Sequence, residues 1–297
     1  MTGGRIGWGV LGAANIARRA MLRAIADSSN GRLVAMASRN AERAREMLSP
    51  YPAARVVDSY DELLADPDIH AVYNPLPNHL HKEWTLRAFA AGKHVLCEKP
   101  LATDATAAAE MAAAAAASGK HLMEAFMYRF HPDMRAFIAG LHDPIYVSAS
   151  FGFTAKGPDD IRMQAPLGGG ALLDVGCYTV SVARWILGEP VHVTAHSRMK
   201  NGVDVTTSAL LRFSGGATAA VWASLESAEI QEVAVMTPEG AHRRTRAFNT
   251  RENFDPYRLM VESFSDSVLR DRPVAIPLEE SIANMRTLDR IRESAKD

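Results

Sequence analysis

The chain has 297 residues, 47% of them hydrophobic, and its formal net charge is −1 at pH 7. That length suits two domains with cores of their own. The near-neutral balance argues against nucleic-acid and anionic-membrane partners, because no basic stripe exists to neutralise phosphates. No stretch reaches the roughly 18 apolar residues of a membrane span, and a first strand expected from Arg5 leaves no room for a signal peptide. With only two cysteines, Cys97 and Cys177, and no metal-ligand spacing between them, we expect a cytoplasmic protein.

The first part of the chain alternates short apolar runs with helical segments. The runs predict strands over residues 5–11, 33–37, 55–57, 69–73, 95–97 and 121–125, and the segments between them predict helices over 15–27, 41–48, 82–91 and 103–117. A further helix is expected after Ser59, because Ser59 and Glu62 form a capping-box pattern. Strands that alternate with helices in this way predict a doubly wound parallel sheet.

The pattern changes after about residue 140. Six further strands are expected over residues 145–153, 191–196, 205–213, 218–224, 230–236 and 242–247, with hairpin turns between several of them. Helices are expected over 171–187, 257–269 and 278–295. Successive hairpins predict an α+β domain with a mostly antiparallel, open-faced sheet. We therefore expect a parallel α/β domain over residues 1–123 and this second domain over 124–297.

A glycine turn follows the first strand and opens the first helix. Its residues are Gly12, Ala13, Ala14, Asn15 and Ile16, in a G-x-A-x-x-A variant of the dinucleotide-binding fingerprint. Alanine at the third position is compatible with close helix–strand packing, whereas alanine at the second holds the backbone slightly away from a pyrophosphate. The alternative is a structural turn in a βαβ unit that binds nothing. Its place in the first unit of the sheet favours a Rossmann domain with a bound dinucleotide.

The end of the second strand indicates which dinucleotide. An NAD site usually has an acidic residue there for the ribose 2′-hydroxyl. This chain has Ser38 and Arg39, a hydroxyl and a guanidinium that suit a 2′-phosphate. A plain surface arginine is the alternative. We expect NADP(H) as the cofactor.

A proline-containing loop follows the fourth strand. Prolines on both sides of Leu76 favour a rigid, extended loop that packs against the ribose or the nicotinamide. The cofactor contacts expected from this segment are Asn74, Leu76, Pro77, Asn78 and His81. His79 and His81 stand two residues apart, but no carboxylate or cysteine completes a ligand set, and no metal site is predicted.

A charged pair ends the fifth strand. Glu98 and Lys99 follow the apolar run and precede Pro100, which stops the strand. They therefore fall at the carboxyl edge of the sheet, where open α/β sheets bind ligands. An ordinary surface Glu–Lys pair is the alternative.

A glycine-rich segment in the second domain carries another candidate group. Three glycines end at Gly170 and lead into a helix on which Asp174 and Tyr178 stand four residues apart and share a face. A tyrosine has an ordinary pKa near 10, and a neighbouring ammonium such as Lys99 would lower it toward use as an acid or base. The alternative is a core aromatic residue with its hydroxyl satisfied.

Together these motifs resemble the Gfo/Idh/MocA oxidoreductase family over nearly the whole chain. The Gly12 turn, Glu98-Lys99-Pro100, the stretch from Glu124 to Arg129 and the Asp174–Tyr178 block carry the resemblance. Tyr178 stands where one subgroup, which includes NADP-dependent aldose dehydrogenases, has tyrosine and inositol dehydrogenases have histidine.

The resemblance also implies roles for individual residues. Lys99 would hydrogen-bond the reacting hydroxyl and the nicotinamide ribose, Tyr178 would move the proton, and Asp174 would orient the substrate or the lysine. Glu98 would contact the ribose side of the cofactor. Two arginines, Arg129 and Arg162, would line the cleft between the domains and contact the cofactor.

The function expected on these grounds is NADP(H)-dependent hydride transfer to or from a hydroxyl or carbonyl carbon of a sugar or similar cyclic polyol. Two alternatives remain: an NAD-dependent glycosidase that oxidises its substrate transiently, and a catalytically silent NADP-sensing regulator. The family implies a homodimer or homotetramer through the second-domain sheet. The region over residues 248–257 is shorter than is usual in the family, which puts that contact in doubt.

Overall fold

The computed structural model describes residues 4–157 and 159–296, which form two compact units. The first unit contains the residues up to Leu101, Thr106–Phe130 and Asn253–Ser281, and the second contains Ala102–Ala105, His131–Glu252 and the chain from Ile282 onward. The chain therefore returns to the first unit near its end. The boundary between residues 123 and 124 stays a prediction, since packing divides the molecule into segments that are discontinuous in sequence.

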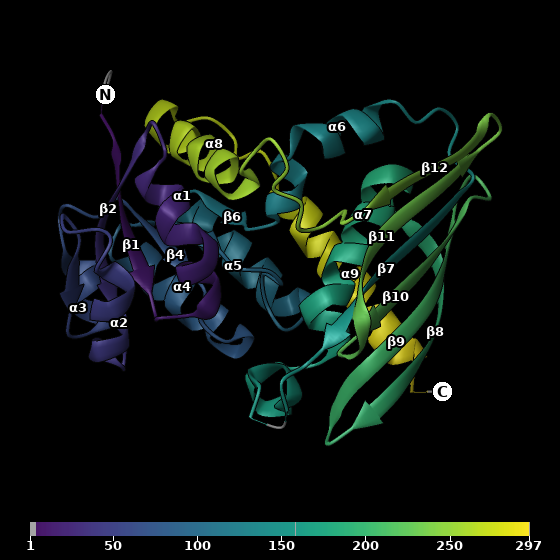
Figure 1. The fold of residues 1–297 in the computed structure, drawn as a ribbon, viewed down its shortest axis with the longest axis horizontal. Helices are drawn as coiled ribbons and strands as arrows, with labels where there is room; N and C mark the ends of the chain where they lie inside the picture. Colours follow the sequence, from purple (N-terminus) through teal and green to yellow (C-terminus); the bar gives the residue numbers. More distant parts are fainter. Residues whose placement is uncertain (1–3, 158, 297) are drawn as a thin grey trace. The chain divides into compact units, whose positions relative to one another are not determined.

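The first unit is built on a six-stranded parallel sheet in the order β3-β2-β1-β4-β5-β6. Figure 1 labels four of its strands, β1, β2, β4 and β6. Its strands are β1 (Ile6–Leu11), β2 (Gly31–Ala37), β3 (Arg55–Val57), β4 (Ala71–Asn74), β5 (His94–Cys97) and β6 (Leu122–Glu124). Every residue of β1 and β4 is buried, as expected for a parallel sheet covered on both faces. This confirms the predicted doubly wound sheet. Strand order reverses between β1 and β4, the point at which such sheets bind ligands.

Helices cover this sheet and include one from far along the chain. They are α1 (Leu22–Ala26), α2 (Ala41–Leu48), α3 (Tyr60–Ala65), α4 (His81–Ala90), α5 (Ala105–Ser118) and α8 (Pro256–Arg270). Helix α8 packs on β1, because Trp8 contacts Phe264 at 5.5 Å between ring centroids and donates through Nε1 to Ser265 Oγ at 3.2 Å. Ser59 caps α3 as predicted by accepting from the Glu62 N–H at 3.0 Å.

The second unit is built on a six-stranded sheet in the order β12-β11-β7-β10-β9-β8. Its strands are β7 (Tyr146–Thr154), β8 (Pro190–Lys200), β9 (Val203–Phe213), β10 (Thr218–Ser224), β11 (Glu226–Thr237) and β12 (Gly240–Thr245). All neighbouring pairs are antiparallel except β7 and β10, which are parallel. The predicted mostly antiparallel sheet is therefore confirmed, and the parallel pair is a feature that the hairpin pattern did not indicate.

Helices α6 (Pro132–Ala139) and α7 (Cys177–Leu187) belong to this unit, and so does α9 (Leu278–Ser294) from Ile282 onward. The helical stretch Ala165–Leu187 is long and apolar enough to cross a membrane by length and composition, but 78% of its most apolar window is buried inside the protein. It is the central core helix of the unit. Helix α6 was not predicted, although Pro132 at its first turn is a helix-start signal.

Candidate functional site

The turn after β1 has a conformation that requires glycine. Gly12 has φ +83°, and its N–H donates to the Ala37 carbonyl of β2 at 2.7 Å. A Cβ at this position would lie 2.9 Å from Leu76 Cδ2 in the loop after β4. Ala17, at the third position of the fingerprint, is fully buried and serves the close packing of helix and strand. Ala14 and Asn15 are more open, half-buried and exposed respectively.

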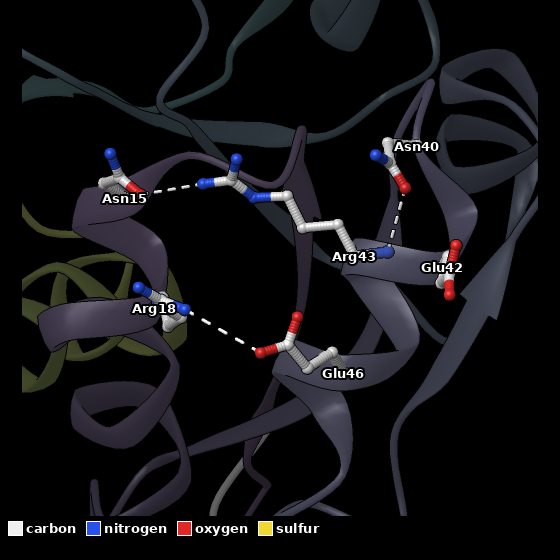
Figure 2. A pocket seen from close by; sticks show the side chains of 6 residues that line it. All are labelled: Asn15, Arg18, Asn40, Glu42, Arg43 and Glu46. Atoms are coloured by element: carbon white, nitrogen blue, oxygen red, sulfur yellow. Dashed lines mark hydrogen bonds and ion pairs between the residues drawn. The ribbon is translucent and has the colours of Figure 1, made fainter.

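An open pocket of about 390 Å³ lies beside this turn (Figure 2). It is lined by Asn15, Arg18, Asn40, Glu42, Arg43 and Glu46. The Arg43 side chain reaches from α2 across to the turn, where its Nη2 donates to Asn15 Oδ1 at 2.7 Å. Its backbone N–H donates to Asn40 Oδ1 at 2.9 Å and so anchors the start of the helix. Arg43 was not predicted as a site residue, although its position in the first turn of the helix after Arg39 indicates a second arginine near the end of β2.

The two residues predicted to read a 2′-phosphate lie at the end of β2. Ser38 is half-buried, and its Oγ accepts from the Asn40 N–H at 3.1 Å. Arg39 is exposed, and its positive charge acts on the Tyr60 hydroxyl, whose pKa is raised overall because burial outweighs that charge. Tyr60 Oη is also 3.4 Å from the position of a Cβ on Gly12. The charge of Arg39 at the end of β2 and the glycine turn at Gly12 therefore lie near the same tyrosine hydroxyl.

The loop after β4 is held by buried polar contacts. Asn74 is fully buried; its Nδ2 donates to the His81 carbonyl at 3.2 Å, and its Oδ1 accepts from the Leu76 N–H at 3.3 Å. Leu76 is buried against the glycine turn, whereas Pro77 and Asn78 are half-buried. His81 is fully buried, with its ring nitrogens 2.8 and 2.9 Å from two backbone carbonyl oxygens.

In the charged pair after β5, the Glu98 carboxylate is held by a hydrogen bond from Tyr73. The Tyr73 hydroxyl donates to Glu98 Oε1 at 2.5 Å, and the Lys99 N–H donates to Glu98 Oε2 at 3.3 Å. Glu98 is buried and Lys99 is half-buried, with a cis peptide bond between Lys99 and Pro100. Tyr73 was not predicted, because within an apolar strand it has the pattern of a core residue.

These groups share one edge of the first unit's sheet. The Gly12 turn, the Ser38–Arg39 pair, the Asn74 loop and the Glu98–Lys99 pair follow the carboxyl ends of β1, β2, β4 and β5, which are adjacent in the order β2-β1-β4-β5. Arg129, just after β6, is mostly buried and pairs with Glu280 at 3.6 Å.

In the second unit, Tyr178 and Asp174 lie where the core helix begins. Tyr178 is buried, with its ring 5.4 Å from that of Phe151 and 5.6 Å from that of Phe248. Asp174 Oδ2 accepts from Arg162 Nε at 2.7 Å, and Arg162 Nη1 donates to Asp160 Oδ1 at 3.1 Å. The carboxylates, that of Asp174 above all, raise the pKa of the guanidinium. Arg162 is therefore held by Asp174, and its predicted contact with a cofactor stays a prediction.

The glycines of this segment serve close packing within the unit. A Cβ on Gly170 would lie 2.1 Å from Asp204 Oδ1, and one on Gly176 would lie 3.3 Å from the Ala223 side chain of β10. Asp204 Oδ2 accepts from the Leu172 N–H at 2.7 Å and so supports the start of the helix. The close contact that the helical glycine indicated is therefore with a strand of the same unit.

Both candidate segments contain a π-helical turn where a plain α-helix was predicted. Ala17–Met21 follows the glycine turn, and Leu172–Gly176 contains Asp174. Single π-helical turns are frequent at functional sites, because they alter the direction of side chains relative to the rest of the helix.

Comparisons with known proteins identify the family and agree with the fold. Residues 6–126 match the model of an oxidoreductase family with an NAD-binding Rossmann fold, and residues 140–243 match the GFO/IDH/MocA C-terminal domain. The chain is 38% identical to D-xylose 1-dehydrogenase (NADP(+)) 2 of Haloferax volcanii over 97% of each chain. It is 33% identical to dTDP-3,4-didehydro-2,6-dideoxy-alpha-D-glucose 3-reductase of Actinomadura kijaniata, over 97% of this chain and 95% of that one.

The solved structures give the same result. KijD10, a 3-ketoreductase from Actinomadura kijaniata in complex with NADP and TDP-benzene, matches with a TM-score of 0.91 and 32% identity over 98% of each chain. Other structures of KijD10 carry a substituted tyrosine or a substituted lysine.

Proposed function

Because the chain belongs to the Gfo/Idh/MocA oxidoreductase family, we propose that it is an NADP(H)-dependent dehydrogenase or reductase of a sugar or similar cyclic polyol. One observation carries the proposal: four neighbouring strand ends of the parallel sheet present a glycine turn, a Ser–Arg pair, a rigid loop and a Glu–Lys pair at one edge. That edge is where doubly wound sheets bind dinucleotides.

The residues present at this edge fit NADP. The positive φ of Gly12 allows the backbone to approach a pyrophosphate, as the fingerprint requires. Arg39 and Arg43, with the Ser38 hydroxyl, would hold the 2′-phosphate, since guanidinium groups match phosphate geometry. No acidic residue stands at the two positions after β2, where an NAD site has one for the 2′-hydroxyl.

The bound nicotinamide would supply hydride donation or acceptance, and the side chains would supply proton transfer and orientation. Lys99 would hydrogen-bond the reacting oxygen of the substrate, and Tyr178 would give or take its proton. Glu98 would contact the ribose side of the cofactor, and Asp174 would orient the substrate or the lysine. Lys99 belongs to the first unit and Tyr178 to the second.

The relatives support a sugar-like substrate. One is a D-xylose dehydrogenase and another reduces a keto group of a nucleotide-linked sugar. KijD10, the solved neighbour in complex with NADP, supports the choice of cofactor. We further propose a homodimer or homotetramer formed through the open face of the second-unit sheet, to be tested by light scattering. A cytoplasmic location stays a prediction that the two free, buried cysteines support.

A screen of coenzymes and substrates tests the proposal. Initial rates are measured at 340 nm with NADP⁺ and NAD⁺ against D-xylose, other aldoses, cyclic polyols and a trans-dihydrodiol. We expect turnover of a sugar, with kcat/KM at least tenfold higher for NADP⁺ than for NAD⁺. Cleavage of nitrophenyl glycosides that depends on NAD⁺ would favour a glycosidase instead. Tight NADPH binding with no turnover of any substrate would favour a regulator.

A further inference from the structure

One buried peptide group, that between Pro100 and Leu101, is held at both of its polar ends by side chains. Its carbonyl oxygen lies 2.9 Å from His81 Nδ1. Its N–H, which belongs to Leu101, donates to Glu124 Oε1 at 2.8 Å. His81, Glu124 and Leu101 are all fully buried. This peptide is the first one after Pro100, so its orientation is coupled to that of the Glu98–Lys99 pair.

The two side chains that hold the peptide come from neighbouring strand ends. His81 begins α4 after the loop that follows β4, and Glu124 is the last residue of β6. The peptide itself follows β5, which lies between β4 and β6 in the sheet. The contacts therefore fix the chain after β5 to both of its neighbours, at the edge where ligands are proposed to bind.

His81 links this peptide to the loop that packs on the glycine turn. Its Nε2 lies 2.8 Å from the Leu76 carbonyl oxygen. Burial lowers the pKa of His81 to about 4, so its ring is neutral at pH 7 and carries one N–H. With that proton on Nδ1, the ring donates to the Pro100 carbonyl, and Nε2 lies beside the Leu76 carbonyl without donating to it. The charge of Lys99 also lowers this pKa, which means that the ammonium acts on the buried ring.

Glu124 is an unusual residue for a fully buried strand end. Burial raises the pKa of its carboxyl group to about 7. An apolar side chain of the same size would avoid this desolvation, but it would leave the Leu101 N–H without its acceptor. Glu124 therefore matters at this position because its Oε1 accepts from the Leu101 N–H.

We propose that His81 and Glu124 are positioning residues, which hold the Pro100–Leu101 peptide by its two polar ends and thereby fix the direction of Lys99. His81 then acts through the peptide and not by direct contact with the cofactor. The inference rests on the catalytic role that the proposed function gives to Lys99.

A matched pair of substitutions tests the Glu124 contact. Glu124→Gln keeps an acceptor oxygen and removes the charge, whereas Glu124→Leu keeps the approximate size and removes the acceptor. With the best sugar from the coenzyme screen, we expect Glu124→Leu to lower kcat at least tenfold and to leave the Kd for NADPH, measured by fluorescence titration, within threefold of wild type. Glu124→Gln should stay within threefold in both quantities.

A second pair tests His81 independently of Glu124. The amide nitrogen of asparagine takes the place of Nδ1, and that of glutamine takes the place of Nε2. His81→Asn should therefore keep at least a third of the wild-type kcat, while His81→Gln, which keeps only the contact to the Leu76 carbonyl, should lose at least tenfold. These variants decide the matter if Glu124→Leu does not fold.

Several results would overturn the inference. One is a kcat for both Glu124→Leu and His81→Gln within threefold of wild type; another is an equal loss in Glu124→Gln and Glu124→Leu. A loss of kcat that is matched by the loss of NADPH affinity and by a fall in Tm would indicate a merely structural role. Lys99→Ala separates this inference from the proposed function: if it retains wild-type turnover, the proposed role of Lys99 is wrong. If Lys99→Ala is inactive and the positioning variants are normal, only the present inference is wrong.

Discussion

Replacing Arg43 by alanine should weaken the binding of NADP⁺ and leave the binding of NAD⁺ unchanged. The guanidinium is already directed at the glycine turn by its 2.7 Å hydrogen bond to Asn15, so a 2′-phosphate in the pocket beside it would meet a preorganised donor. A hydrogen bond to a charged group contributes about 1.5–3 kcal/mol. Because Arg43 is exposed and therefore screened by solvent, we use the lower end, about 1.5 kcal/mol, which is about tenfold in affinity.

The assay compares KM for NADP⁺ and for NAD⁺ in wild type, Arg43→Ala and a control, Arg45→Ala. Arg45 is an exposed arginine of the same helix that does not line the pocket. We expect KM for NADP⁺ to rise about tenfold in Arg43→Ala and less than twofold in Arg45→Ala, with KM for NAD⁺ unchanged in both. An additional Arg39→Ala substitution should raise KM for NADP⁺ further, but because both arginines are proposed to hold the same phosphate, their effects are not expected to add in free energy.

Equal losses for the two coenzymes would refute this reasoning, because NAD⁺ lacks the group that Arg43 is proposed to bind. An equal effect of Arg45→Ala would also refute it, since general positive charge on α2 would then explain the loss. Raising the ionic strength should weaken the wild-type preference for NADP⁺, as expected for screened charges.

Three further predictions concern single residues. Gly12→Ala should weaken NADP⁺ binding at least tenfold, because φ +83° is strained for alanine and its Cβ would lie 2.9 Å from Leu76 Cδ2. Calorimetric titration tests this, and binding within threefold of wild type would contradict it. Gly176→Ala should lower the free energy of unfolding in urea denaturation, because a Cβ would lie 3.0 Å from Leu172 Cδ1 and 3.3 Å from the Ala223 Cβ. Crowding of this kind costs about 1–3 kcal/mol, against about 1 kcal/mol gained in helix propensity, and a higher midpoint would contradict the packing. Burial lowers the pKa of His81 to about 4 from 6.5, so the neutral ring stabilises the fold above pH 6.5, and this contribution of about 3 kcal/mol is lost as the pH falls toward 4. Urea midpoints measured between pH 7 and pH 4 should therefore fall more in wild type than in His81→Asn. Parallel curves for the two proteins would contradict this prediction.

The sequence predicted those parts of the fold that depend on local signals. Periodicity and turn residues placed both sheets and nearly all helices, and α2, β3 and β10 have the predicted bounds. The helix cap of α3 could also be predicted, because the Ser59 side chain and the Glu62 N–H that donates to it lie within four residues of the chain.

Features that depend on distant contacts could not be predicted in the same way. Helix α8 belongs to the first unit through long-range contacts, among them those of Phe264 and Ser265 with Trp8, more than 250 positions earlier in the chain. The roles of Tyr73 and Glu124 likewise arise from partners in the segment after β5, which is distant in sequence from both residues. Within its own strand Tyr73 follows an ordinary apolar pattern, and Glu124 is a charged residue whose partner the local sequence does not indicate. The π-helical turns have no local sequence signal that separates them from the α-helix around them.

The candidate site shows the same division. Motif spacing indicated Gly12, Lys99 and Tyr178, since each stands at a strand end or a helix start with its own sequence signature. It did not indicate that Arg162 holds Asp174, because the eleven residues between them include the 3₁₀ turn Ala165–Leu167 and a glycine loop of irregular geometry.

The central claim, that Tyr178 moves a proton during hydride transfer at an NADP site, is tested most directly by Tyr178→Phe. Phenylalanine keeps the ring contacts with Phe151 and Phe248, so the core should be unaffected and Tm should stay near the wild-type value. General acid–base catalysis contributes about 10²–10⁴-fold. We therefore predict that the variant loses at least a hundredfold in kcat on the best sugar while its Kd for NADPH stays within twofold of wild type. A folded Tyr178→Phe enzyme with a kcat within threefold of wild type would contradict the account.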